Sequence, residues 1–563
     1  MDKTFNHLLI VGHNVPFDLV IDEMLRICAA IIVILISVAA AAPASAVGVD
    51  VENKTITVSV YQEPKILDSM SVSTVEFTAE VLAHIQEGLM RLDARRRVVG
   101  GVAESWEMTP KQLRFRLRKD AKWQNGEPVT AADFVYAWRT LVRPETGSQS
   151  ANLASPIVNA LAILRGEKPA ASLGARAVSQ LELEIDLAHP CNWCLKLMTS
   201  SAFYPVNQKF HEGAGEAFGT SPSTHLSNGA FLLEDWQRGK QFTLARNPVY
   251  WANKRIHLNK IHYGFIASDA KTSFNLYRSG ELAVIRLNRD TLSEGTKLKQ
   301  RIRVAPTGYL MHLQFSHKEG MLSANENLRK AIALVVDKND LVNRVLAIPG
   351  TRVSDSMFHD WMAVGEKTRS AVLQPKAHEP DIRVAKKYVQ KAKAELGITG
   401  RPTMTFTIFD STDSGRIAEY LQQRLALIDV DLKIDPQTVQ MLLDKWFKGT
   451  TDIALIGWIP DVDDPIDQLS FLGNPDIRSV FQGLYPGSDM SDIYYTYRDA
   501  TSDEQRLAVV KQAQAFFENR VTVLPLYESY GSTLIDPRLR GYVFQPVRAF
   551  SDYRNARIVD VND

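Results

Sequence analysis

Residues 113–138 read LRFRLRKDAKWQNGEPVTAADFVYAW, and this stretch contains a strand, a turn and a helix in immediate succession. Apolar residues alternate with arginines over its first six positions, which is the period of a strand with one buried face. An Asn-Gly pair at 125–126 predicts a tight turn. Thr130 followed by Asp133 has the pattern of a helix capping box, with Asp in place of Glu. A strand followed directly by a helix favours a mixed α/β protein.

The same alternation of short strands and helices continues on both sides of this stretch. No repeat of fixed period and no low-complexity linker interrupts it, and a chain of 563 residues is too large for one hydrophobic core. We therefore expect an α/β protein of at least two lobes. The further predicted strands are 55–60, 181–187, 242–245, 404–409 and 430–434, and the predicted helices are 77–92, 381–396 and 416–427.

The N-terminal region carries an export signal. An apolar segment at residues 28–41 is followed by Ala44-Ser45-Ala46, a small-residue cleavage site of the A-x-A kind. The pattern predicts a signal peptide over residues 1–46, cleaved near Ala46. No second hydrophobic segment of membrane-spanning length follows it.

The first 23 residues do not suit a positively charged signal-peptide start. They include Asp2, Asp18, Asp22 and Glu23, whereas Met24 is followed by Leu and Arg. We expect translation to begin at Met24, which makes residues 1–23 a mis-annotated extension.

After cleavage only Cys191 and Cys194 remain, in the sequence Pro-Cys-Asn-Trp-Cys. Export to an oxidising compartment favours a local disulfide between them. A redox-active pair is the alternative, although no thioredoxin-like pattern surrounds it. Two cysteines with the nearby His189 fall short of a zinc site.

Charge and motifs argue against several function classes. The chain has 65 Lys+Arg against 64 Asp+Glu, so no broad basic surface for nucleic acid is expected. Hydrolase signatures such as H-E-x-x-H and a nucleophile elbow are absent, and His211-Glu212 lacks a second histidine. We expect no enzyme activity, no catalytic residues, no metal and no cofactor.

Residues 457–465, Gly-Trp-Ile-Pro-Asp-Val-Asp-Asp-Pro, gather one indole and three carboxylates after the apolar run 453–456. That run predicts a short buried strand, so the turn lies at a strand's end, where ligand groups are commonly presented. This combination suits capture of a cation, because a desolvated carboxylate there can hold an ammonium group with the aromatic face of Trp458 beside it. The alternative is that Asp461 or Asp463 caps a turn and that Trp458 is part of the core.

Several different short motifs follow one another along the chain. Among them Trp106 and Trp123 are expected to pack in lobe cores. The motifs are Glu63-Pro64, 101–106 (GVAESW), 117–123 (LRKDAKW), 128–138, 228–231 (NGAF), 246–251, 277–281 (YRSGE) and 328–337. In their order and spacing, the chain resembles the periplasmic oligopeptide-binding proteins, the peptide-family (family 5) solute-binding components of ABC importers.

This resemblance implies an α/β, two-lobed periplasmic-binding-protein clamshell of type II with an additional domain beside the first lobe. The chain is expected to cross between lobes near 306–309 and 524–527. The implied domains are a discontinuous lobe I of 47–96, 206–306 and 527–563, the additional domain 97–205, and lobe II of 307–526.

The resemblance also implies a ligand-binding set. Asp461 stands where relatives hold the α-ammonium group of a peptide, and Trp458 matches a neighbouring aromatic of the cleft wall. Glu76 falls in the first-lobe strand, around 73–77, that is expected to pair with the ligand backbone. Tyr309 lies near a hinge position that holds a cysteine in some relatives.

Recognition of the other end of the ligand is less defined. Arg416 lies near a position where relatives place a basic side chain for the peptide carboxylate, and its alternative role is a solvated residue at a helix N-terminus. Leu455, Trp446 and Val439 depart from the pattern of relatives nearby. Peptide length and side-chain preference therefore do not follow from the sequence.

By this resemblance the protein is a monomeric periplasmic receptor that captures oligopeptides. It pairs with the peptide backbone and delivers the ligand to an inner-membrane ABC permease with cytoplasmic ATPases. The alternatives keep the fold and change the ligand to a murein peptide, a dipeptide, a nickel chelate or haem, or make the protein a ligand-sensing receptor.

Overall fold

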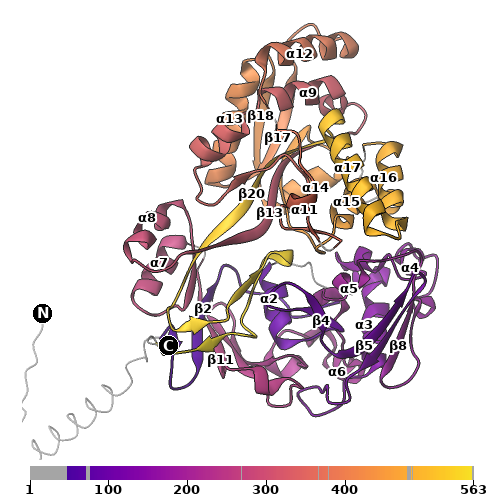
Figure 1. Ribbon diagram of the computed structural model, residues 1–563, viewed down its shortest axis with the longest axis vertical. Coiled ribbons are helices and arrows are strands. Elements are labelled where there is room, and N and C mark those ends of the chain that lie inside the picture. The colour runs from indigo at the N-terminus through magenta and orange to yellow at the C-terminus, as the bar shows by residue number, and fades with distance from the viewer. Residues whose placement is uncertain are drawn as a thin grey trace, which may run out of the picture. The chain divides into compact units, whose positions relative to one another are not determined.

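Two long strands, β13 (Arg303–Phe315) and β20 (Val523–Ile535), lie side by side at the centre of the largest sheet of this computed structural model (Figure 1). They pair antiparallel, with register shifts between Pro306 and Leu310 and between Met311 and His312. The irregular pairing coincides with the expected first crossing near 306–309. The structure describes residues 47–70, 76–267, 269–365, 367–377, 379–477, 483–484 and 486–560.

The largest sheet has the strand order β12-β20-β13-β19-β17-β18, and β14 (Arg352–Val353) pairs with β20. The sequence predictions at 404–409, 430–434 and 453–456 are confirmed as strands. The other strands are β12 (Val284–Leu287), β17 (Thr403–Phe409), β18 (Asp431–Gln437) and β19 (Ile453–Trp458).

Helices surround the end of this sheet that carries β17 and β18 (Figure 1). Leu328, Val389 and Leu421, from three of them, are buried in one core with Phe406 of β17. The predicted helices at 381–396 and 416–427 are confirmed, and the side chain of Asp381 caps the first of them. The helices of this region are α9 (Glu326–Val335), α12 (Ile382–Leu396), α13 (Thr412–Ala426), α14 (Val439–Lys448), α15 (Ile466–Gly473), α16 (Ser488–Asp499) and α17 (Asp503–Arg520).

A five-stranded sheet contains both early and later parts of the chain, in the order β1-β2-β11-β10-β9. Predicted strands 55–60 and 242–245 are confirmed in it. Its strands are β1 (Val49–Asp50), β2 (Thr55–Val60), β9 (Phe231–Gln237), β10 (Gln241–Arg246) and β11 (Lys260–Ile266). Helices α7 (Ala270–Arg278) and α8 (Arg289–Lys297) follow, before and after β12.

Helix α2 (Glu76–Ile85) packs against the core of this sheet. The predicted ligand-pairing strand around 73–77 is therefore wrong at Glu76 and Phe77, because these residues begin a helix. The helix is buried on all sides from Thr78 to Ile85, and its apolar residues Val81 and Leu82 belong to the core of the sheet. The earlier part of that predicted strand lies outside the described residues, as does the predicted signal peptide.

The predicted helix over 77–92 ends earlier than expected. Helix α2 stops at Ile85, and β3 (Met90–Leu92) then pairs antiparallel with β4 (Val98–Gly100).

A separate four-stranded sheet has the order β5-β6-β8-β7, and the stretch 113–138 supplies most of β6 and the helix α3. The alternation predicted there is observed in β6, and the capping box of α3 is formed by Thr130 and Asp133. The Asp133 carboxylate also accepts a hydrogen bond from the indole of Trp123. The elements are β5 (Ala103–Thr109), β6 (Gln112–Leu117), β7 (Ala175–Ala177), β8 (Glu182–Asp186) and α3 (Ala131–Leu141).

Of the two tryptophans expected in lobe cores, Trp123 is buried, as predicted. The prediction for Trp106 is wrong, because 36% of this residue is exposed. Trp106 lies on β5, which is the edge strand of its sheet and turns most of its residues to solvent.

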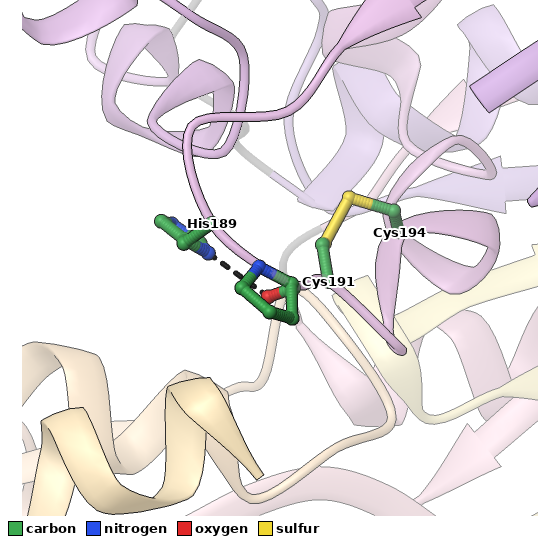
Figure 2. Close-up of a disulfide and its surroundings, with 4 residues drawn as sticks. His189, Cys191 and Cys194 are labelled. Carbon is green, nitrogen blue, oxygen red and sulfur yellow. Dashed lines mark hydrogen bonds between the residues drawn. A yellow bond between two sulfur atoms is a disulfide. The ribbon is translucent and has the colours of Figure 1, made fainter. Parts of the chain in front are cut away.

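The predicted disulfide is present between Cys191 and Cys194, at the start of α5 (Cys194–Leu197) (Figure 2). The imidazole of His189 donates from Nδ1 to the carbonyl oxygen of Pro190, 3.0 Å away, beside the bridge. The disulfide loop also contacts the segment between α16 and α17, because the side-chain amide of Asn192 donates a hydrogen bond to the carbonyl oxygen of Ala500. None of the helices that the structure describes has the length and apolar character needed to cross a bilayer.

Candidate functional site

The turn after β19 contains three aspartates, and the structure separates their roles. Asp463 accepts the backbone N–H of Ala363 at 2.8 Å. Asp464 is buried and accepts the hydroxyl of Tyr497 at 2.7 Å. These two carboxylates hold the turn in place. Asp461 differs in its partner, which is the guanidinium of an arginine, and a third of its side chain remains exposed.

The turn is also fixed by a fourth aspartate, Asp467, in the first turn of α15. One oxygen of this buried carboxyl accepts the indole N–H of Trp458 at 2.7 Å, and the other accepts the backbone N–H of Asp461 at 3.0 Å. Burial and the neighbouring Asp461 carboxylate raise the pKa of Asp467 well above its ordinary value. Asp467 was not among the predicted site residues, although its position two residues after Pro465 was a signal that it belonged to the same turn.

Trp458 and Tyr309 lie at the same strand end as Asp461. The Trp458 ring packs 4.4 Å, centroid to centroid, from that of Phe471. Gly457 allows the Tyr309 ring to approach β19, because a Cβ atom at this glycine would lie only 3.0 Å from that ring and 2.8 Å from the sulfur of Met311. The structure therefore brings together three of the predicted site residues, namely Asp461, Trp458 and Tyr309.

Tyr309 also lines a cavity of about 440 Å³. Its wall includes Phe77 of α2 and the buried Glu80, whose carboxylate accepts the hydroxyl of Tyr263 and the backbone N–H of Ser551. The cavity combines aromatic and polar walls, as binding pockets for organic ligands do.

The other two predicted site residues are not gathered at this turn. Arg416 lies in α13, with 42% of its side chain exposed, and its ion pair is with Asp413 on the same helix at 3.5 Å. Glu76 is the first residue of α2, and its side chain lies outside what the structure describes.

An arginine from the distant C-terminal segment reaches the turn and was not foreseen. The Arg548 Nε atom lies 3.4 Å from Asp461 Oδ1, and only 8% of the Arg548 side chain is exposed. No local pattern in the sequence marks this residue as a partner of Asp461. Within the described part of the chain, no group of three or more His, Cys, Asp or Glu residues is arranged to hold a metal ion.

Comparison with known proteins identifies the family. The profile described as "Bacterial extracellular solute-binding proteins, family 5 Middle" matches residues 97–478, which is more than half of the chain. The periplasmic oligopeptide-binding protein OppA of Escherichia coli is 29% identical over 485 residues, covering 81% of this chain and 84% of OppA.

Solved structures agree. The substrate-binding domain of an oligopeptide ABC transporter from Bacillus anthracis has a TM-score of 0.78 and 29% identity, over 90% of this chain and 99% of that one. Listeria monocytogenes OppA bound to peptide has a TM-score of 0.75 and 25% identity, over 90% and 99% of the two chains. They confirm the predicted two-lobed α/β fold class. The chain therefore belongs to family 5 of the bacterial extracellular solute-binding proteins, which are binding proteins and not enzymes.

Proposed function

We propose that this protein captures oligopeptides in the periplasm by holding their α-ammonium group on Asp461. The observation that carries the proposal is the difference among the three aspartates of the turn. Asp463 and Asp464 accept internal hydrogen bonds from Ala363 and Tyr497. The Asp461 carboxylate has an arginine as its charged neighbour, stays one third exposed, and lies on a backbone fixed by Asp467. A charge-assisted bond to such a preorganised carboxylate is strong and directional.

Support for a peptide ligand comes from the relatives. The Escherichia coli protein is named an oligopeptide-binding protein, and the Listeria protein was solved with peptide bound. In this proposal an extended ligand pairs its backbone with strands of the protein, and the cavity beside Tyr309 accepts side chains with little selectivity.

The proposal includes delivery. The lobes, with crossings near 306–309 and 524–527, close over the peptide as a population shift, and the closed monomer docks on an inner-membrane ABC permease powered by ATPases. The lobe boundaries given above belong to this proposal. Export requires the leader, so N-terminal sequencing of the secreted protein should read from about Val47.

The test of the ligand class is titration calorimetry of refolded, ligand-stripped protein. Peptides of two to six residues are compared with their N-acetylated versions, because refolding removes peptides retained from the cell. Saturable binding that needs the free amino group is expected. Absence of binding by correctly folded protein would contradict the proposal and favour a chelate, haem or another ligand.

A further inference from the structure

The segment after β22 (Val543–Gln545) is wedged against the Asp461 turn. The backbone N–H of Arg548 donates to the carbonyl oxygen of Pro460 at 3.2 Å. On its other side, the Pro546 carbonyl lies so close to Gly308 that a Cβ atom there would come within 2.0 Å of it. The position of Arg548 is therefore set by tight packing against both the turn and the irregularly paired part of β13 at Gly308.

The backbone at this place is strained. Arg548 has φ +61° and Ala549 has φ +52°, two successive non-glycine residues in the left-handed region. This conformation is unfavourable for residues with a Cβ atom, and such strain persists mainly where the surroundings enforce it, often at ligand sites. Glycine would adopt the same conformation without this cost.

The guanidinium of Arg548 is buried and lacks hydrogen-bond acceptors. Its side chain is 8% exposed, and none of its three nitrogens donates a hydrogen bond to any residue that the structure describes. The contact with Asp461 brings opposite charges to 3.4 Å without forming a hydrogen bond. A guanidinium carries five N–H donors, and leaving them unpaired in a buried site is costly, so the site is built to receive an acceptor.

Charge balance indicates which acceptor. A peptide ammonium placed on Asp461 would add a second cation next to Arg548. Asp467, the neighbouring acid, is already engaged by Trp458 and by the backbone of Asp461, and its raised pKa favours the neutral form. A carboxylate on the ligand would restore neutrality and match the planar fork of the arginine.

We infer that Asp461 and Arg548 form a two-charge receptor for the amino-terminal end of the ligand, with Asp461 holding the ammonium group and Arg548 holding a carboxylate within the first two residues. This inference rests on the proposed function and adds a specificity to it. The preferred ligands are peptides with an acidic residue at position one or two.

The test uses tetrapeptides in which Glu is exchanged for its neutral isostere Gln at position one, two or four. Calorimetry with the wild-type protein should show that Glu is preferred about tenfold at position one or two, because a bidentate charge-assisted contact is gained. At position four, outside the reach of the inferred receptor, the same exchange supplies the control.

Two variants assign the preference. Arg548→Gly removes the side chain and suits the left-handed backbone, so the variant should fold, and its Glu/Gln ratio should fall to about one at every position. Arg548→Lys keeps the positive charge and loses the planar guanidinium, so its Glu/Gln ratio should lie between those of wild type and Arg548→Gly. Thermal unfolding checks that both variants are folded.

Failure of this inference is distinguishable from failure of the proposed function. If no free-amino peptide binds, the proposed function is wrong. If peptides bind but wild type shows no Glu preference at positions one and two, or keeps it in Arg548→Gly, the two-charge receptor is wrong. Tighter binding of all peptides by Arg548→Gly would also overturn it, because Arg548 would then be an internal counter-ion that competes with the ligand.

Discussion

Asp461 and Arg416 were predicted to bind the two ends of a peptide, its ammonium and its carboxylate, and their surroundings in the structure are very different. Asp461 lies on a turn whose backbone and indole are held by the buried Asp467. Arg416 lies on a helix surface with 42% of its side chain exposed, and it forms an ion pair with the neighbouring Asp413. Under the proposed function, the ammonium end of a peptide meets a preorganised turn and its carboxylate end meets a solvated helix surface, which suits a receptor for peptides of several lengths.

Removing the support of the turn should have the largest effect. In Asp467→Ala the indole of Trp458 and the backbone N–H of Asp461 lose their acceptor together. We expect a loss of about 3 kcal/mol in the free energy of unfolding, since each unsatisfied donor costs about 1–3 kcal/mol. Urea denaturation measures it. Asp413→Ala, which removes the ion-pair partner of Arg416, is the matched control. An equal loss in its free energy of unfolding would show that the Asp461 turn is no better supported than the surface of α13.

The protonation of Asp467 provides a second test. Because its pKa is raised, the folded turn keeps a proton that the unfolded chain releases near pH 4, so the stability contributed by this group is full below pH 4. That contribution is lost as the pH rises through the folded pKa. Asp467→Asn cannot ionise, so its destabilisation relative to wild type should shrink by about 1 kcal/mol or more between pH 4 and pH 7.

This second effect is measured by urea unfolding of both proteins at three pH values. Titrating groups that do not interact with Asp467 cancel in the difference, whereas the linked titration of Asp461 is part of the measured effect. If the difference in the free energy of unfolding between the two proteins stays constant with pH, the pKa of Asp467 is not raised, and its carboxylate is charged in the folded turn.

Substitution of Arg416 is expected to have the smallest effect on stability and on peptide affinity. Arg416→Gln should change stability by less than about 0.5 kcal/mol, because exposed ion pairs on one helix contribute little. Peptide affinity should change less than about twofold at every length. A tenfold loss confined to peptides of one length would show that Arg416 meets the carboxylate at that length, and the carboxylate end would no longer be open.

Local patterns predicted most of the elements, because their signals lie within a few residues. The alternation in β6 and the capping box of Thr130 are examples. The strand expected at Glu76 was wrong, because it came from likeness to relatives and not from the local helical pattern of apolar residues. Trp106 was misplaced because an indole in a strand does not reveal that the strand lies at a sheet edge.

For the site, the sequence predicted that Asp461 and Trp458 share a turn, since both lie in one short stretch after a buried strand. It did not predict the support from Asp467, because a carboxylate at a helix start reads equally well as a surface charge. Arg548 could not be predicted at all. Its contact with Asp461 depends on the C-terminal segment returning to the turn, and no periodicity in either segment records that approach.

The proposed function depends on Asp461 holding the α-ammonium group of the ligand. The most direct measurement is calorimetry of wild type and Asp461→Asn with one free peptide and its N-acetylated form. We predict a loss of about 2 kcal/mol, roughly thirtyfold in affinity, for the free peptide, and a loss below about threefold for the acetylated one. Equal losses for both peptides would contradict the account.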